Sequence, residues 1–277
     1  GAVTFVNVAA EAGVDFRFAP FKVGTWRSYK TIDGLVHNMA WSACAAADGR
    51  LWVGTVGGVC CFDGAAFTEL DFGGRLLEYR IRSIHQSGDG VLWFGTDNEG
   101  AWCWDGISVS QLSSADGLPH NEVRAICSTA SGDLFFGTAD GLARRSGKDW
   151  THFTTRDGLA DQWIWSLHCD AEQILWIGTN AGLSRFDGQQ FTSFTTRDGL
   201  VDNRVTDITH DAQGDLWIAT HGGVSHFDGR NFVNYTPEDG LINELVLAVR
   251  CDRHGGVWLG TWRGASHFDG ERFSNFT

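Results

Sequence analysis

The stretch Leu175–Gly188, LWIGTNAGLSRFDG, decides the fold because its pattern recurs along the chain. Its Leu-Trp pair returns every 41 or 42 residues, with one Phe replacing Trp and one Val replacing Leu. The six pairs are Leu51-Trp52, Leu92-Trp93, Leu134-Phe135, Leu175-Trp176, Leu216-Trp217 and Val257-Trp258. A fixed period of this length indicates a repeat architecture.

Two further motifs keep the same phase. Asp-Gly-Leu begins at Asp33, Asp116, Asp157, Asp198 and Asp239, and an aromatic residue precedes Asp-Gly at Phe62, Trp104, Phe186, Phe227 and Phe268. Chance does not hold three motifs in phase over six units. A helical solenoid is excluded, because no segment shows the 3.6-residue period of a helix.

Each repeat translates into four short strands. In the fifth repeat these are Val205–Ile208, Leu216–Thr220, Val224–Phe227 and Phe232–Tyr235, and Asp228-Gly229 favours a type I′ hairpin turn. Four antiparallel strands in about 41 residues make one propeller blade. Since one such sheet cannot cover its own two apolar faces, neighbouring blades must stack and cover them.

The repeats occupy residues 31–277, and residues 1–30 hold three more strand-like segments, at 4–8, 14–18 and 25–29. We expect a single all-β domain over residues 1–277, a β-propeller of four-stranded antiparallel blades. Seven blades are favoured, with residues 1–30 forming a degenerate first blade of three strands. The alternative is six blades with residues 1–30 as a hairpin on the rim.

Charge excludes several classes of partner. The chain has 21 basic and 34 acidic residues and a net charge of −13, so it lacks the basic excess that nucleic acid binding requires. The same acidity disfavours an anionic membrane surface. No apolar run is long enough to cross a bilayer, so we expect no membrane insertion by this segment. The first residues lack the basic segment followed by an apolar one that is typical of a leader.

The cysteines predict neither a metal site nor a disulfide framework. There are seven, an odd number, and none has the spacing of zinc ligands; they are Cys44, Cys60, Cys61, Cys103, Cys127, Cys169 and Cys251. Most lie in apolar strand patterns, where a free cysteine acts as a small hydrophobic residue. Seven unpaired thiols lean weakly towards a reducing, cytoplasmic compartment.

The order Asp-Gly-Leu, Asn-x-Val, Leu-Trp-Ile-Gly-Thr and Gly-Leu-Ser-Arg-Phe-Asp-Gly resembles the two-component regulator propeller repeat, over residues 31–277. The resemblance implies a ligand-sensing domain, usually extracytoplasmic or periplasmic and fused to a histidine kinase or another signalling output. Several members of that family are similar to carbohydrate sensors. The second repeat departs from the pattern at residues 74–80, and the third has Arg145-Ser146-Gly147 at the aromatic-Asp-Gly turn.

Variable loops on a rigid frame are where binding function usually lies. In each repeat, such loops precede the innermost strand and join the second and third strands. They supply the candidate ligand-binding residues His37, Asn38, Tyr79, Arg80, Asp97, Asn98, Glu99, His120, Asn121, Gln162, Trp163, Asn180, Asn203, Arg204, His221, Glu244, Trp262 and Arg263.

Each type of candidate has two interpretations. Trp163 and Trp262 could stack on a sugar, or they could pack between blades. Arg80, Arg204 and Arg263 could clamp an anion through two parallel hydrogen bonds, or form ordinary ion pairs. Asn residues before a strand could instead bond to the local backbone.

The candidate loops are expected to converge around the central opening on one face of the propeller, which we name the top-face funnel. The leading hypothesis is a sensor that binds a carbohydrate or small anion in this funnel. A protein–protein interaction scaffold is the alternative, and a propeller lyase or hydrolase comes third. The sequence lacks GxSxG, HExxH and phosphate-loop motifs, so we expect no enzyme, catalytic residue, cofactor or bound metal. We expect a monomer or a part of a larger signalling chain.

Overall fold

The structure is a computed structural model that describes residues 3–5, 27–69 and 79–277. Its strands form one two-stranded sheet and six four-stranded sheets, each with its strands in chain order. The two-stranded sheet pairs β1 (Val3–Phe5) with β2 (Arg27–Tyr29). The first four-stranded sheet contains β3 (Ala40–Ala45), β4 (Leu51–Thr55), β5 (Gly58–Phe62) and β6 (Phe67–Glu69). The second contains β7 (Ile81–Gln86), β8 (Leu92–Thr96), β9 (Ala101–Trp104) and β10 (Val109–Leu112). The third contains β11 (Val123–Ser128), β12 (Leu134–Thr138), β13 (Gly141–Ser146) and β14 (Asp149–Phe153). The fourth sheet contains β15 (Ile164–Cys169), β16 (Leu175–Thr179), β17 (Leu183–Phe186) and β18 (Phe191–Phe194). The fifth contains β19 (Val205–His210), β20 (Leu216–Thr220), β21 (Gly223–Phe227) and β22 (Phe232–Tyr235). The sixth contains β23 (Val246–Cys251), β24 (Val257–Thr261), β25 (Gly264–Phe268) and β26 (Phe273–Phe276).

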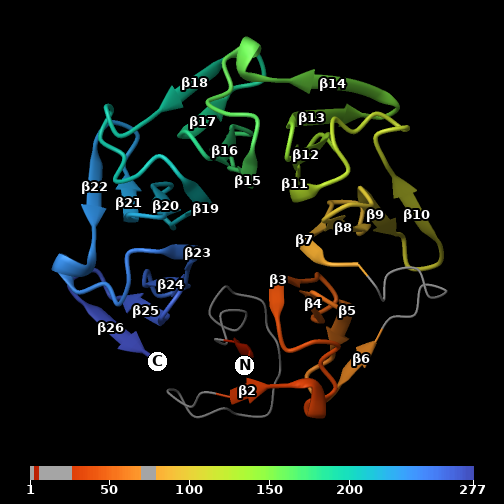
Figure 1. Cartoon of the computed structure of the whole chain (residues 1–277), viewed down its shortest axis with the longest axis horizontal. Helices are drawn as coiled ribbons and strands as arrows, with labels where there is room; N and C mark the ends of the chain where they lie inside the picture. Colours follow the sequence, from red (N-terminus) through yellow and green to blue (C-terminus); the bar gives the residue numbers. More distant parts are fainter. Residues whose placement is uncertain (1–2, 6–26, 70–78) are drawn as a thin grey trace. The chain divides into compact units, whose positions relative to one another are not determined.

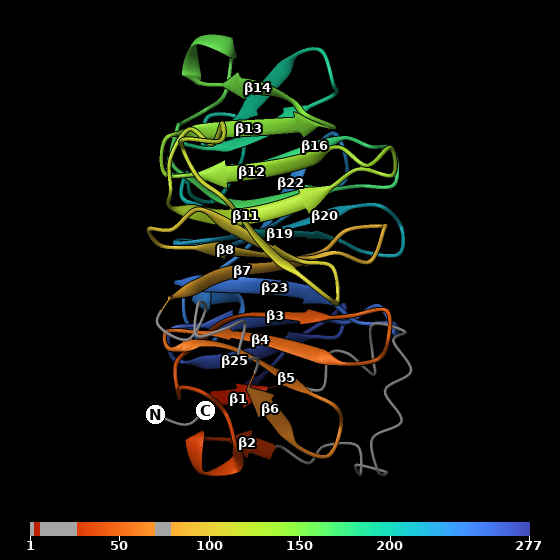
Figure 2. The same cartoon turned by 90° about the vertical axis from the view of Figure 1, so that its right-hand side faces the viewer.

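The chain divides into two compact units, residues 1–128 and residues 129–277. In the first unit, β3, β4 and β5 lie side by side (Figure 2), and β7 contacts both β3 and β4 of the preceding sheet. In the second unit, β19 contacts β15 and β16, and β23 contacts β19 and β20 (Figure 1). Within each unit, the first strand of a sheet therefore packs on the sheet before it, as blades of an all-β β-propeller do. That residues 1–277 form one domain stays a prediction.

The favoured count of seven blades is wrong, because the described residues contain six four-stranded sheets. The segment at residues 25–29 resembles a fourth strand for a physical reason. The Tyr29 ring lies 5.3 Å from the rings of Phe62 and Phe67, as Phe194 lies 5.4 Å from Phe227 at the next sheet. However, β2 pairs with β1 in a sheet of only two strands. The expected strand at residues 14–18 lies outside the described residues.

The recurring Leu-Trp-x-Gly-Thr motif forms the second strand of each sheet. All five residues of β8, β12, β16 and β20 are buried, since neighbouring strands and sheets cover both faces of these strands. The glycine of the motif marks a close approach. A β-carbon at Gly178 of β16 would lie 2.4 Å from Oγ of Ser166 in the same sheet and 2.8 Å from Cγ1 of Val205 in the next one. A larger side chain would therefore clash with both sheets.

The Asp-Gly turns form by side-chain capping, and the expected type I′ geometry is wrong. A type I′ turn needs positive φ at both central residues, but of Asp228 and Gly229 only the glycine has it. Asp228 Oδ1 instead accepts hydrogen bonds from the backbone N–H groups of Arg230 and Asn231, at 2.7 Å and 2.6 Å. Three Asp-Gly-Leu motifs lie at the ends of short 3-10 helices, each with its Asp as the last helical residue and its Gly as the C-cap. The helices are η1 (Thr31–Asp33), η2 (Thr155–Asp157) and η3 (Pro237–Asp239).

All seven cysteines are present as thiols, and Cys60, Cys61 and Cys127 are buried. Burial raises the pKa of Cys60 to about 11 and that of Cys251 to about 12, so these thiols stay protonated and poorly reactive at neutral pH. The helical segments described are 3-10 turns of three residues, and none could cross a bilayer.

His85 of β7 is expected to make stability fall in mild acid. Burial lowers the pKa of His85 from 6.5 to about 4, and its Nε2 lies 2.8 Å from Ser128 Oγ. The unfolded chain therefore binds the proton more readily, and stability that is complete above pH 6.5 is lost as the pH falls towards 4. Between pH 7 and about pH 4.5, the free energy of unfolding should fall by about 2–3 kcal/mol less in His85→Gln than in the parent protein. Urea melts at the two pH values measure this difference. The exposed His152→Gln should keep the parent profile, and a parental profile in His85→Gln would contradict the assignment.

Candidate functional site

The first strands of five sheets carry a register shift at their second residue. The pairing with the second strand passes from Ala40 to Ser42 in the first sheet and from Ile81 to Ser83 in the second. The same shift occurs in β15, β19 and β23. The skipped residues are Trp41, Arg82, Trp165, Thr206 and Leu247. A β-bulge of this kind re-aims a side chain and is frequent near functional sites.

In the first unit, the bulged residues join an array of charges. The Arg82 guanidinium lies over the Trp41 ring, 4.0 Å from the ring centroid, and its Nε donates a hydrogen bond to the Asp97 carboxylate. Arg124, at the position in β11 equivalent to Arg82, donates to the Glu122 carboxylate from Nη2. Glu122 Oε1 also lies 4.0 Å from Arg82 Nη2. Arginines of two adjacent first strands therefore pair with carboxylates from neighbouring loops.

A third arginine approaches the array from the loop before β7. Arg80 Nη1 lies 3.6 Å from Asp97 Oδ2, and its side chain is 58% exposed while that of Asp97 is 12% exposed. We name Trp41, Arg80, Arg82, Asp97, Glu122 and Arg124 the arginine cluster. Its three guanidinium groups face two carboxylates, which leaves an excess of positive charge on a chain of net charge −13.

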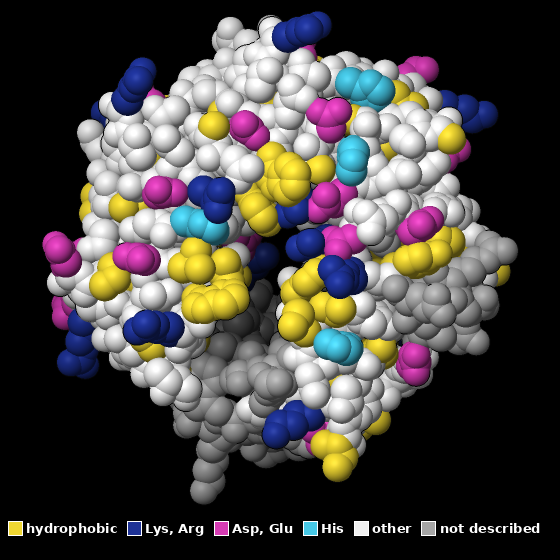
Figure 3. Space-filling model, viewed as in Figure 1, with side chains coloured by type: hydrophobic (Ala, Val, Ile, Leu, Met, Phe, Trp, Pro, Cys, Tyr) yellow, Lys and Arg dark blue, Asp and Glu magenta, His cyan; other side chains and the backbone are white. Residues whose placement is uncertain are grey.

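Burial differs across the arginine cluster. The Arg124 side chain is 7% exposed; burial lowers the pKa of Arg124, while the Glu122 charge acts in the opposite direction. Arg82 is 26% exposed, so exposure rises from Arg124 to Arg80. On the face drawn in Figure 3, basic and acidic side chains adjoin hydrophobic ones. A ligand could reach Arg80 and Arg82 directly, with Arg124 behind them.

Several predicted residues of the first unit serve local turns. Asn38 Oδ1 accepts from the Thr31 N–H at 2.8 Å, and Asn121 Oδ1 accepts from the Ser114 N–H at 2.7 Å. His37 and His120 act similarly, each accepting through Nδ1 from a backbone N–H two residues ahead. These four side chains therefore bond to the nearby backbone, and their role in ligand binding stays a prediction.

Among the other predicted residues of the first unit, Arg80 and Asp97 belong to the arginine cluster. Tyr79 stacks on Trp102 at 6.1 Å and joins the core. The backbone carbonyl of Glu99 accepts from Gln111 Nε2 at 2.7 Å, and Asn98 is exposed. The structure thus brings two of these residues, Arg80 and Asp97, into one charged array.

In the second unit, Trp163 and Asn180 contact Trp165, and Gln162 contacts Asp140. Trp165 Nε1 donates to Asn180 Oδ1 at 2.7 Å, and the rings of Trp163 and Trp165 lie 6.2 Å apart. Gln162 Nε2 donates to Asp140. Trp163 is half-buried beside this group, which favours packing over an open stacking platform.

The remaining predicted residues of the second unit lie near the ends of β19 and β23. Asn203 Oδ1 caps the Thr196 N–H at 2.8 Å. Arg204 Nη1 lies 3.3 Å from His221 Nδ1, and the pKa of His221 is lowered by burial and by the Arg204 charge. Glu244 and Arg263 are exposed, and Trp262 is 74% exposed. Trp262 therefore keeps an open ring face.

Sequence reasoning missed Trp41, Arg82, Glu122 and Arg124. The candidates came from loops, whereas Trp41, Arg82 and Arg124 lie within the first strands. Glu122 lies in the loop before β11, beside the candidates His120 and Asn121. The second position of the first strand reads Trp, Arg, Arg, Trp, Thr and Leu along the six repeats. That variation beside constant neighbours was the available signal. The bulges that re-aim these residues leave no such mark in the sequence.

The chain was compared with models of known protein families. The model of the two component regulator propeller family matches residues 34–57, 75–98, 158–181 and 199–222. Four of the six repeats thus match the two-component regulator propeller repeat. This confirms the resemblance, and the second repeat matches despite its altered Asp-Gly-Leu segment. A comparison with curated proteins finds no match.

Solved structures with similar folds come from different functional classes. The extracellular domain of BT3049 from B. thetaiotaomicron, described as a hybrid two-component system, aligns with a TM-score of 0.82 at 20% identity, over 91% of this chain and 36% of that one. Virginiamycin B lyase from Staphylococcus aureus aligns at 0.67 and 14%, over 86% and 84%. PorZ of Porphyromonas gingivalis, a surface component of the type-IX secretion system, aligns at 0.67 and 15%, over 90% and 42%. This chain thus spans about a third of the BT3049 ectodomain, and these similarities show the fold alone.

Proposed function

We propose that this chain is the ligand-recognition part of an extracytoplasmic signalling protein and binds a small anion at the arginine cluster. The repeat family supports the sensing role, and the extracellular setting of BT3049 supports the compartment. The observation that carries the ligand class is the array of Arg80, Arg82 and Arg124 around two carboxylates. Ligand class, compartment and non-catalytic role are all part of the proposal.

Chemistry favours an anion over a neutral sugar at this site. Arg82 covers a face of the Trp41 ring at 4.0 Å, which is the surface on which a sugar would stack. A guanidinium group recognises carboxylate, sulfate or phosphate oxygens through paired hydrogen bonds. The Arg80 guanidinium lies 3.6 Å from the Asp97 carboxylate and 5.9 Å from the centroid of the Trp41 ring. Both contacts are longer than a hydrogen bond, so Arg80 can turn to an incoming anion without breaking a short one.

The cysteine thiols are compatible with this compartment. Protonated, buried thiols such as Cys60 react slowly with oxidants, and burial raises the pKa of Cys60 to about 11. The thiol count therefore does not argue against an oxidising environment.

Titration with matched sugars tests the proposal. D-galacturonate carries a carboxylate that D-galactose lacks, so isothermal calorimetry should show binding of the uronate only. Arg80→Ala should weaken uronate binding about 10–100-fold, the equivalent of about 1.5–3 kcal/mol for charge-assisted hydrogen bonds. Sulfate should compete with the uronate.

Arg145→Ala is the matched control, because Arg145 lies 5.8 Å over Trp150 much as Arg80 lies 5.9 Å over Trp41. It should change uronate affinity by less than about twofold. Equal losses in the two variants, or equal binding of galactose and galacturonate, would contradict an anion site at the arginine cluster. Absence of binding by either sugar or by sulfate would point to the alternative of a protein partner.

A further inference from the structure

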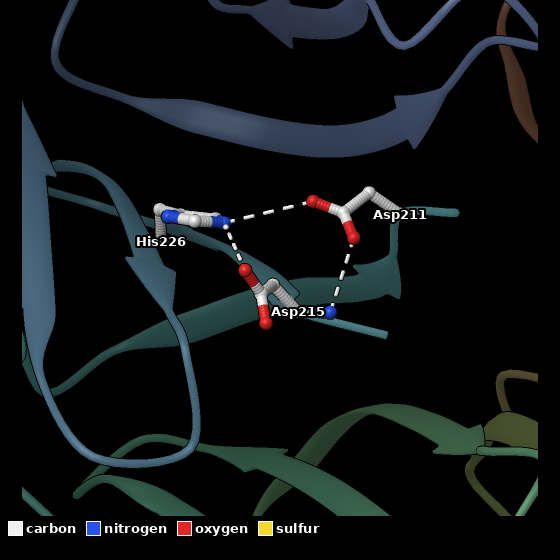
Figure 4. Close-up of side chains that lie close together, drawn as sticks. All are labelled: Asp211, Asp215 and His226. Carbon is white, nitrogen blue, oxygen red and sulfur yellow. Dashed lines mark hydrogen bonds and ion pairs between the residues drawn. The ribbon is translucent and has the colours of Figure 1, made fainter. Parts of the chain in front are cut away.

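A second cluster of chemically active side chains lies in the fifth sheet, in the second unit. The turn between β19 and β20 carries Asp211 and Asp215, and His226 of β21 pairs with Trp217 of β20. His226 Nε2 points at both carboxylates (Figure 4), lying 3.6 Å from Asp211 Oδ2 and 3.5 Å from Asp215 Oδ2. We propose that Asp211, Asp215 and His226 bind a divalent transition-metal ion of the zinc class.

The separations between these atoms fit ligands around a metal ion. They exceed the usual 2.7–3.2 Å of a nitrogen–oxygen hydrogen bond. Ligands bound at 2.0–2.2 Å in a tetrahedral zinc site lie about 3.3–3.6 Å apart, which includes both measured distances. One imidazole nitrogen and two carboxylate oxygens would leave a fourth position for water. All three groups can offer a ligand atom within 4.8 Å of the others.

Neighbouring groups hold the three side chains in place. Asp211 Oδ1 accepts from the backbone N–H groups of Gln213 and Asp215 at 3.0 Å each, and Asp211 Oδ2 accepts from Trp217 Nε1 at 3.2 Å. The His226 ring lies against Trp217, with centroids 4.6 Å apart. Such outer contacts orient metal ligands. Asp215 is 33% exposed, so an ion can enter from solvent.

The repeats supply an internal comparison, which is the independent observation behind the proposal. In the sixth sheet, His267 Nε2 lies 3.0 Å from Asp252 Oδ2, and Gly256 replaces Asp215. A β-carbon at Gly256 would lie 2.3 Å from His267 Nε2, so that pair leaves no room for a third ligand. His226 Nε2 instead lies 3.6 Å and 3.5 Å from two carboxylates, which is beyond hydrogen-bond distance.

The third sheet has a different side chain at the position of His226. There Arg144 replaces the histidine, and its Nε donates to Asp133, the counterpart of Asp215, at 3.0 Å. A permanent cation thus neutralises a single carboxylate. Of the six four-stranded sheets described, the fifth alone sets two carboxylates against an imidazole. A bound cation would balance the two adjacent carboxylates of Asp211 and Asp215.

Metal titration of the chelator-treated protein tests the site. Zn²⁺ should bind with one-to-one stoichiometry by calorimetry and raise the melting temperature, and Co²⁺ should give the visible absorption of a low-coordinate site. His226→Gln should weaken Zn²⁺ binding at least about 100-fold and Asp215→Asn at least about 10-fold. Affinity should fall from pH 7.5 to 5.5, because protons compete for the ligands.

His267→Gln is the matched control, since it removes the equivalent histidine of the sixth sheet, and it should leave affinity within about twofold of the parent. His210→Gln tests the other close histidine pair, in which His168 Nε2 lies 2.6 Å from His210 Nδ1. Melting curves without metal would show that each variant folds. Unchanged Zn²⁺ affinity in folded His226→Gln, loss of binding in His210→Gln instead, or no Zn²⁺ binding tighter than about 100 μM would overturn the proposal.

Discussion

Replacing Trp217 by alanine is expected to lower the free energy of unfolding by about 3–5 kcal/mol. The Trp217 ring is 5% exposed. It stacks on Tyr235 at 5.7 Å and lies 5.8 Å from Phe268 of the sixth sheet. It belongs to a core cluster that also contains Val246 and Leu259. Truncation would open a cavity between two sheets and remove the indole N–H that Asp211 accepts.

Urea unfolding followed by circular dichroism measures this effect. Trp262→Ala is the control, because the Trp262 side chain is 74% exposed and its loss should change stability by no more than about 0.5 kcal/mol. If Trp217→Ala had the denaturation midpoint of the parent, packing between sheets would not be what holds the repeats together.

Replacing Glu122 by alanine is expected to lower the free energy of unfolding by about 3 kcal/mol or more, because it leaves a buried charge without its nearest partner. Arg124 is 7% exposed and donates to Glu122 through Nη2. Arg82 Nη2, 4.0 Å from Glu122, would also lose a compensating charge. Loss of the carboxylate would therefore raise repulsion among the guanidinium groups.

The double variant Glu122→Leu with Arg124→Met separates charge from packing, because apolar replacement of a buried ion pair is often neutral or stabilising. It should recover most of the stability that Glu122→Ala loses in urea melts. Glu244→Ala removes an exposed acid and should have little effect. A double variant as unstable as the single one would show that the ion pair does not carry the cost.

The fold could be predicted because the repeat motifs report burial directly. Leu-Trp-x-Gly-Thr strands are covered on both faces, and the aspartates of the Asp-Gly turns cap local backbone. The blade count was missed because Tyr29 packs on Phe62 as a fourth-strand aromatic would, while strand pairing, which a sequence pattern does not show, gives β2 a single partner.

The candidate sites were only partly predictable. Loop variability pointed to Arg80 and Asp97, but asparagines such as Asn121 vary little in role and cap turns. Arg82 escaped notice because a register shift, which strand patterns do not reveal, turns it away from the ladder. His226 lies 15 residues from Asp211 in the chain, and only the hairpin pairing brings their side chains together.

Nitrogen-15 spectra of the arginine side chains give the most direct test of an anion site at the arginine cluster. Adding D-galacturonate to labelled protein should shift the Nε–Hε signals of Arg80 and Arg82 most, with Arg145 and Arg156 unchanged, and D-galactose should shift none. Assigned signals of Arg80 and Arg82 that stay in place while the uronate binds would contradict the account.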